Sequence, residues 1–143
     1  MAEQMRAADL LITGTQEGGA PLDRSRYVNV ADLVLRAGKP VLVGASTQDK
    51  LDLRTVVVGW KDTREARRAV QDALPLLRLA ERVVVVATTG EGAQLRNIAS
   101  DLELDAGLVV GGAYGHTRLR EWVLGGVTRD FLLHPSRCSL VSH

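Results

Sequence analysis

The residues best suited to chemistry lie in one glycine-rich segment, residues 108–127. An apolar run typical of a buried strand opens it, and a turn with Gly112 and Gly115 leads into a helical pattern that ends at Gly125 and Gly126. Glycines let backbone N–H groups approach an anion closely, and the first turn of a helix adds unpaired donors and a positive dipole end. The segment therefore predicts phosphate binding. The alternative, that these glycines only make tight turns in an α/β fold, stays open.

Two basic side chains follow the turn in this segment. His116 and Arg118 could place positive charge near a bound phosphate. They are equally well explained as solvated residues at the start of a helix, and the sequence does not separate the two interpretations.

Other kinds of site are not indicated. No serine, histidine and acidic residue are ordered as a catalytic triad, and no Walker-type GxxxxGK[ST] run occurs. Cys138, His134 and His143 lack the spacing of metal ligands, and one cysteine excludes an internal disulfide. We therefore predict no catalytic residue and no metal site.

The glycine segment resembles the nucleotide-loop signature of the universal stress protein family. The resemblance rests on the run AYGHTRLREWVLGGVTRD and on its spacing of glycine, two residues, glycine, nine residues and glycine. The run VVVGWKDTREARRAVQDALPLLRLA also looks like the first strand and helix of that domain in bacterial members. The resemblance implies an adenine nucleotide as ligand, with Mg²⁺ if the ligand is ATP. It implies phosphate contacts through the backbone of five residues, Gly112, Gly115, Gly125, Gly126 and Val127.

The chain departs from the family pattern at two positions. Many binding members have a hydroxyl residue where this chain has Gly126, which removes one hydrogen bond to the ligand. Lys61 follows the first strand of the domain, where binding members often carry an aspartate that contacts the ribose or base. Lysine cannot accept those hydrogen bonds, so Lys61 either faces a phosphate or is solvated.

Composition limits the class of protein. The 143 residues are enough for one domain with a proper core, and 45% apolar and 24% charged residues are typical of an ordinary soluble protein. The net charge of +1 and an aromatic share of 3% indicate neither nucleic-acid nor membrane binding. The N-terminus has no signal-peptide pattern, so we expect a cytoplasmic location.

Alternating apolar patterns predict the elements that position the glycine segment. We expect strands at residues 10–13, 40–43, 55–60, 82–87, 108–111 and 138–142. Helices are expected at residues 30–37 and 127–134, around Leu95 to Leu102, and after Asp62, the predicted N-cap, with Glu65 completing a capping box. This alternation predicts an α/β fold with a doubly wound, mostly parallel sheet. The resemblance implies the universal-stress-protein type, also called adenine nucleotide alpha hydrolase-like.

The chain also contains an internal repeat. Shifted by 98 positions, Leu10 falls on Leu108, Gly14 on Gly112, and the pair 42–43 on the pair 140–141, without a gap. In the first copy, Gly115 is replaced by Glu17, Gly125 by Tyr27 and Gly126 by Val28, in the positions of the phosphate loop. An acidic and two bulky side chains should repel or block an anion, so we expect only the second copy to bind.

The family suggests an account of this layout. Residues 1–45 resemble the tail of one domain, and residues 54–143 a second domain with one helix and one strand missing. We expect the strands of the second unit in the spatial order second, first, fourth, fifth, which leaves residues 83–87 at a sheet edge. Family dimers usually join through their last strands, so residues 40–43 are expected to pair antiparallel with residues 138–142. A homodimer through the last strands or through the exposed edge follows.

Three functions are compatible with these observations. The leading one is a non-catalytic, dimeric stress protein that responds to an adenine nucleotide. The second is a structural or association module that has lost nucleotide binding. The third is a slow ATPase or phosphotransferase that uses Mg²⁺, with His116 or Lys61 assisting.

Overall fold

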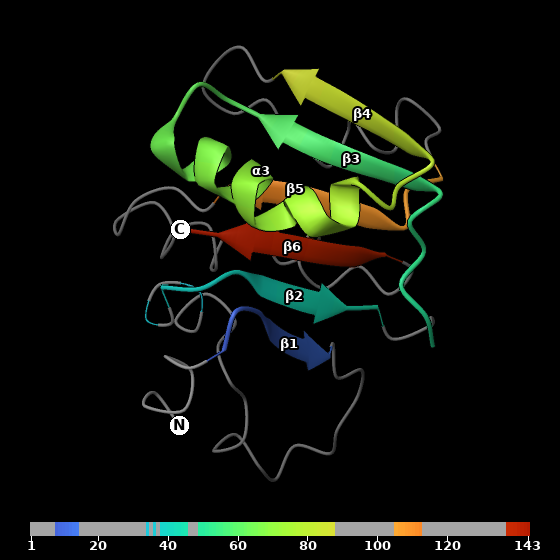
Figure 1. Ribbon diagram of the computed structural model, residues 1–143, viewed down its shortest axis with the longest axis horizontal. Coiled ribbons are helices and arrows are strands. Elements are labelled where there is room, and N and C mark those ends of the chain that lie inside the picture. The colour runs from blue at the N-terminus through green and yellow to red at the C-terminus, as the bar shows by residue number, and fades with distance from the viewer. Residues whose placement is uncertain are drawn as a thin grey trace, which may run out of the picture.

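The computed structural model describes residues 8–14, 34, 36, 38–45, 49–87, 105–112 and 137–143. In this part the chain forms a six-stranded mixed sheet and one helix (Figure 1). The strands are β1 (Leu11–Gly14), β2 (Val41–Gly44), β3 (Thr55–Trp60), β4 (Arg82–Ala87), β5 (Leu108–Gly112) and β6 (Cys138–Ser142). The helix is α3 (Arg64–Leu77). The α/β class is therefore confirmed.

The strands lie in the order β1-β2-β6-β5-β3-β4. The last four positions are the order predicted for the second unit, and that prediction is confirmed. All neighbouring pairs are parallel except β2 and β6, which pair antiparallel as predicted. Both edges of β6 are thus paired within one chain, whereas β4 and β1 end the sheet.

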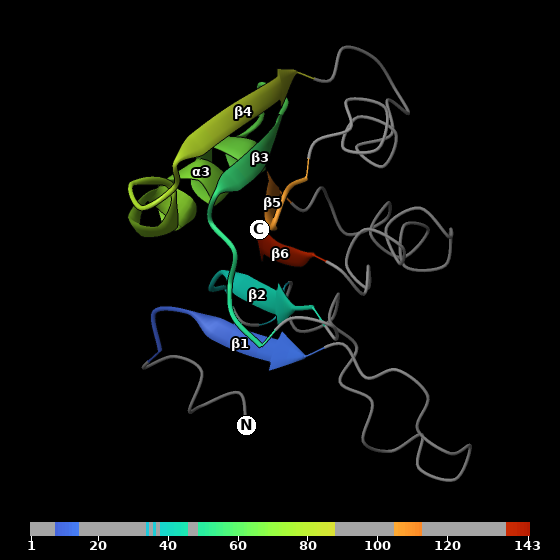
Figure 2. The same ribbon diagram turned by 90° about the vertical axis from the view of Figure 1, so that its right-hand side faces the viewer.

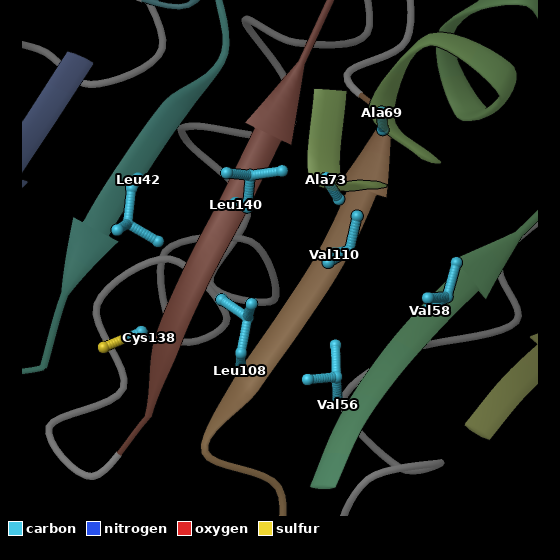
Figure 3. Close-up of a cluster of buried hydrophobic side chains, with 9 residues drawn as sticks. All are labelled: Leu42, Val56, Val58, Ala69, Ala73, Leu108, Val110, Cys138 and Leu140. Atoms are coloured by element: carbon cyan, nitrogen blue, oxygen red, sulfur yellow. The ribbon is translucent and has the colours of Figure 1, made fainter. Parts of the chain in front are cut away.

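Strand β3 is covered on both faces because most of its side chains are apolar. Val56 and Val58 join the larger core cluster on the α3 face, and Val57 joins a second cluster with Val109 on the other face. A continuous β-branched run is the pattern expected of a strand covered on both faces. The larger cluster is drawn in Figure 3, where Leu42 of β2 and Leu140 of β6 lie side by side.

Helix α3 packs closely because its buried stripe is made of small residues. Ala66, Ala69 and Ala73 are buried at helical spacing against the sheet. The N-cap is Thr63, whose hydroxyl accepts a hydrogen bond from the Ala66 N–H at 3.3 Å. The prediction of Asp62 as the cap is wrong by one residue, because the Thr63 hydroxyl is the acceptor that satisfies a first-turn amide.

Helix α3 contacts residues of both repeat copies. Its contacts are mainly to β5 and β6, and Figure 2 shows it on one face of the sheet. The Arg68 guanidinium donates a hydrogen bond of 3.0 Å to the carbonyl of Gly38, just before β2. Helix α3 therefore also ties the first repeat copy to the second.

The other predicted helices fall outside the described residues, except that Val34 and Arg36 are helical and Val34 is buried. The doubly wound arrangement, which needs helices on both faces, stays a prediction for the same reason. No helix in the described part of the chain is long and apolar enough to cross a membrane.

The register of the sheet follows the internal repeat. In β1–β2, Ile12 lies opposite Leu42, and in β5–β6 the residues 98 positions later, Val110 and Leu140, lie opposite each other. Leu42 also pairs with Leu140, its own repeat equivalent, across the antiparallel junction. The registers are therefore related by a local twofold axis through that leucine pair, and such an axis keeps equivalent side chains on the same face.

Candidate functional site at the carboxyl ends of β3 and β5

The candidate site lies where the winding of the sheet reverses. From β3 the chain proceeds outward to β4, whereas from β5 it proceeds to β6 on the other side, and β3 and β5 are neighbours. Such a switch point is where open α/β sheets bind ligands, beyond the carboxyl ends of the strands. Lys61 directly follows β3 and Gly112 ends β5, so these two predicted site residues lie at the carboxyl ends of neighbouring parallel strands.

Gly112 has a packing role that the sequence did not indicate. A Cβ built at this position would lie 2.6 Å from the backbone nitrogen of Ala66 and 2.6 Å from the carbonyl carbon of Glu65. The first turn of α3 therefore rests directly on Gly112, and only glycine permits that approach. The absence of a side chain is explained here by helix packing, whether or not an anion also binds.

Gly111 presents a different environment from its neighbour. A Cβ built there would meet no atom within 4 Å, and successive residues of a strand point to opposite faces. The described residues thus leave space beside β5 on the face opposite α3. This is the side from which a ligand could reach the backbone at the end of the strand.

Lys61 lies between the end of β3 and the start of α3 and is half-buried. The next residue, Asp62, forms an ion pair with Arg67 on the first turns of the helix. Asp62 is thus engaged within the protein, which favours a structural role for its carboxylate over contact with a ribose.

Ser142, at the carboxyl end of β6, is a further polar residue of this region that the sequence did not indicate. It is the register partner of Gly112, and its hydroxyl is fully buried and has no hydrogen-bond partner among the described residues. A buried polar group left unpaired costs about 1–3 kcal/mol. No spacing pattern marks a single serine at the end of a strand, so only the register reveals it.

Six of the predicted site residues lie outside the described residues: Gly115, His116, Arg118, Gly125, Gly126 and Val127. Their roles in binding phosphate stay predictions, and the described geometry brings together only Lys61 and Gly112 of the original set.

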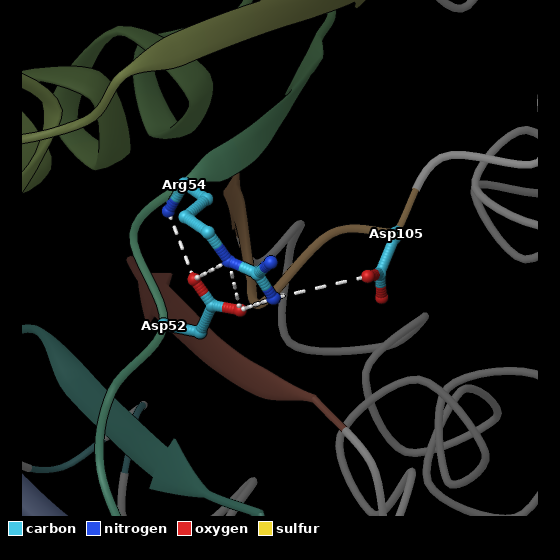
Figure 4. Close-up of polar contacts among 3 residues, drawn as sticks. All are labelled: Asp52, Arg54 and Asp105. Carbon is cyan, nitrogen blue, oxygen red and sulfur yellow. Dashed lines mark hydrogen bonds and ion pairs between the residues drawn. The ribbon is translucent and has the colours of Figure 1, made fainter.

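Within the described ranges, an ion-pair cluster lies at the opposite end of the strands, where β3 and β5 begin. The Arg54 guanidinium donates to both carboxylate oxygens of Asp52, at distances from 2.7 to 3.2 Å, and lies 3.9 Å from Asp105 (Figure 4). These hydrogen bonds lower the pKa of Asp52 and raise that of Arg54. Because the residues precede β3 and β5, the cluster lies at the amino ends of these strands, away from the candidate site.

Among the described residues, no group of three histidine, cysteine, aspartate or glutamate side chains is placed to hold a metal ion. Comparisons with protein-family models, with curated proteins and with solved structures found no match to the chain.

Proposed function

We propose that the chain binds an adenine nucleotide at the carboxyl ends of β3 and β5 and that binding, without turnover, is its function. The observation that carries the proposal is the switch point between these two strands, where Lys61 and Gly112 lie at one edge. The glycine pattern of residues 112–127 and its resemblance to the universal stress protein family support the same ligand.

The geometry suggests how an anion would be held. The glycine segment leaves the sheet at the end of β5, where the described residues leave space beside Gly111. Backbone N–H groups of residues 112–127 would donate to the phosphates, with Mg²⁺ bridging phosphate oxygens if the ligand is ATP. The Lys61 ammonium at the end of β3 can supply positive charge at the same end of the sheet.

The proposal is tested by thermal unfolding of the full chain with and without ATP and Mg²⁺. A ligand present at about a hundred times its Kd stabilises the folded state by about 2.7 kcal/mol. We expect such a shift for the wild type and its loss in Gly115→Asp, which places a negative charge in the loop. Gly14→Asp, at the repeat equivalent of Gly112, is the matched control and should keep the shift. Equal behaviour of all three chains contradicts the proposal.

A slow ATPase is the catalytic alternative to this proposal. Single-turnover measurement of phosphate release, with enzyme in excess over ATP, separates the two. We expect release no faster than in buffer, because the sequence places no general base or metal-bound nucleophile at the loop. Release that depends on Gly115 would replace the binding proposal with a catalytic one.

A second candidate function, association without nucleotide, is favoured by the β4 edge. Strand β4 carries no charge between Arg82 and Ala87, and Val83 and Val85 are 41% and 61% exposed. An uncharged apolar edge invites pairing with another strand. Because β6 is paired on both sides, a homodimer through the last strands would have to displace β2, and β4 is the route that leaves the fold intact.

Sedimentation of the wild type and of Val85→Lys tests this second candidate. We expect a dimer that the charged variant converts to monomer, with Ile12→Lys at the other edge as control. A wild type that is monomeric at all concentrations contradicts it.

A further inference from the structure

The free edge of β1 is the repeat equivalent of a position that is occupied in the second copy. In the second copy, β5 pairs with β3 in parallel, with Val56 opposite Leu108 and Val58 opposite Val110. The residues 98 positions before Leu108 and Val110 are Leu10 and Ile12. Strand β1 pairs only with β2 in the described part of the chain, so the place of β3 is open beside it.

The exposure of Ile12 on this edge agrees with an unoccupied neighbouring position. Val110 is fully buried beneath α3, whereas Ile12 on the same face is 67% exposed. In Figure 1, α3 lies over β5 and β6, and no described helix lies over β1. Ile12 is thus an apolar residue that is exposed, although its repeat equivalent is covered by a helix and belongs to the core.

Gly14 gives a second, independent indication. At its equivalent, Gly112, a Cβ would lie 2.6 Å from the backbone of the first turn of α3, so only glycine fits there. A Cβ built at Gly14 would meet nothing within 4 Å. The first copy therefore has the glycine that admits a helix, and the described residues leave open space within 4 Å of it.

A helix over β1 would also fit beside α3. Strands β5 and β1 are three strand spacings apart, about 14 Å, and packed helices need about 8–10 Å between their axes. The twofold relation keeps Ile12 and Val110 on one face, so the second helix would lie beside α3 on the same side of the sheet.

We infer that the β1 edge, formed by Leu10, Ile12 and Gly14, is a docking surface for a strand–helix unit of a partner protein. The unit has the chemistry of residues 55–77: a β-branched apolar strand, parallel to β1, followed by a helix with small residues at its buried positions. The strand would complete the sheet, and the first turn of the helix would cover Gly14. A second copy cannot donate its own β3 without unfolding, because β3 is paired on both edges.

The test uses a labelled synthetic peptide of residues 54–80 as the probe and the full chain as receptor. Fluorescence anisotropy should show saturable binding in a 1:1 ratio, and a scrambled peptide should not bind. Ile12→Lys and Gly14→Ala should each weaken binding at least tenfold. Gly14→Ala is the more informative variant, because the added Cβ meets no atom of the described residues within 4 Å but would lie against the docked helix.

Val85→Lys at the β4 edge is the matched control and should change the affinity less than twofold. Hydrogen exchange gives an independent readout: the peptide should protect the backbone amide of Ile12, which faces the free edge, because the Leu11 amide already donates to Pro40 on the β2 side. Absence of saturable binding overturns the inference. Binding that survives Ile12→Lys and Gly14→Ala, or that is lost in Val85→Lys, also overturns it, because the peptide would then use another surface.

Discussion

The strand pairs β1–β2 and β5–β6 are alike in register and opposite in surroundings. Each pairs in parallel with the same offset, and each ends its first strand at a glycine. Yet all of β5 and β6 is buried, whereas residues of β1 alternate between half-buried and exposed. Within the first pair only β1 is exposed, since β2 is buried beside β6; the main contacts of β3 and α3 are made with the second pair.

This contrast shows that the pairing and register of a strand do not by themselves determine how deeply its side chains are buried. The local sequence is sufficient for pairing and register, since both copies achieve them. Burial requires a further strand and helix. A residue such as Ile12 therefore contributes little until something covers it, whereas its equivalent Val110 is part of the core.

The largest expected effect is on core packing. Leu108 is fully buried, and its equivalent Leu10 is only partly buried. Leu108→Ala should lower the free energy of unfolding by about 3 kcal/mol, within the range for buried leucines. Leu10→Ala should cost less than half as much. Urea unfolding measures both, and equal losses would show that the two copies are equally covered.

Adding one Cβ atom at Gly112 or at Gly14 compares the two copies directly. Gly112→Ala forces a Cβ against the backbone of Glu65 and Ala66, so we expect a loss of about 1–3 kcal/mol. Gly14→Ala should be neutral or stabilise by about 0.5 kcal/mol, because the unfolded chain loses conformational freedom. Thermal unfolding of the pair checks this, and a larger loss for Gly14→Ala would contradict the open space at β1.

Helix α3, which covers β5 and β6, can be destabilised at its N-cap residue, Thr63. Thr63→Ala removes the hydroxyl that accepts from the Ala66 N–H, and should lower stability by about 1 kcal/mol. Hydrogen exchange should show faster opening of the α3 amides, while the β1–β2 amides change less. Uniform acceleration across the sheet would mean that α3 supports both copies equally.

The smallest expected effect is the pH dependence of the Asp52 cluster. The pKa of Asp52 is lowered in the folded state by its hydrogen bonds to Arg54, so its stabilising contribution is present above the unfolded-state pKa. The contribution is lost as the pH falls through the lower, folded-state pKa. Asp52→Asn should therefore flatten the decline in stability between pH 5 and 2, roughly the range in which an aspartate titrates. An unchanged decline, measured by urea midpoints, would show that the ion pair does not contribute.

Much of the sheet could be predicted from the sequence. The runs at 55–60, 82–87 and 138–142 match β3, β4 and β6 residue for residue, because their apolar runs are long and clearly bounded. The antiparallel junction between β2 and β6 was predicted from the repeat and the family resemblance together. The edge position of β4 followed from the missing strand.

The candidate site was less predictable. The close contact of Gly112 with α3 depends on tertiary packing, and one glycine has the same sequence signature beside a helix or a phosphate. The buried hydroxyl of Ser142 is evident only from its register with Gly112. The cap at Thr63 was missed because Asp62 and Thr63 are both good N-cap residues and pattern alone does not rank them.

The most direct test of the nucleotide proposal compares the two copies in one experiment. In a two-dimensional ¹H–¹⁵N NMR titration of the full chain with ATP and Mg²⁺, the account predicts large shifts for the amides of Lys61, Gly111 and Gly112. The equivalents of the two glycines, Thr13 and Gly14, should stay unmoved. Absence of saturable shifts at the β3 and β5 ends, or equal shifts at Thr13 and Gly14, would contradict the account.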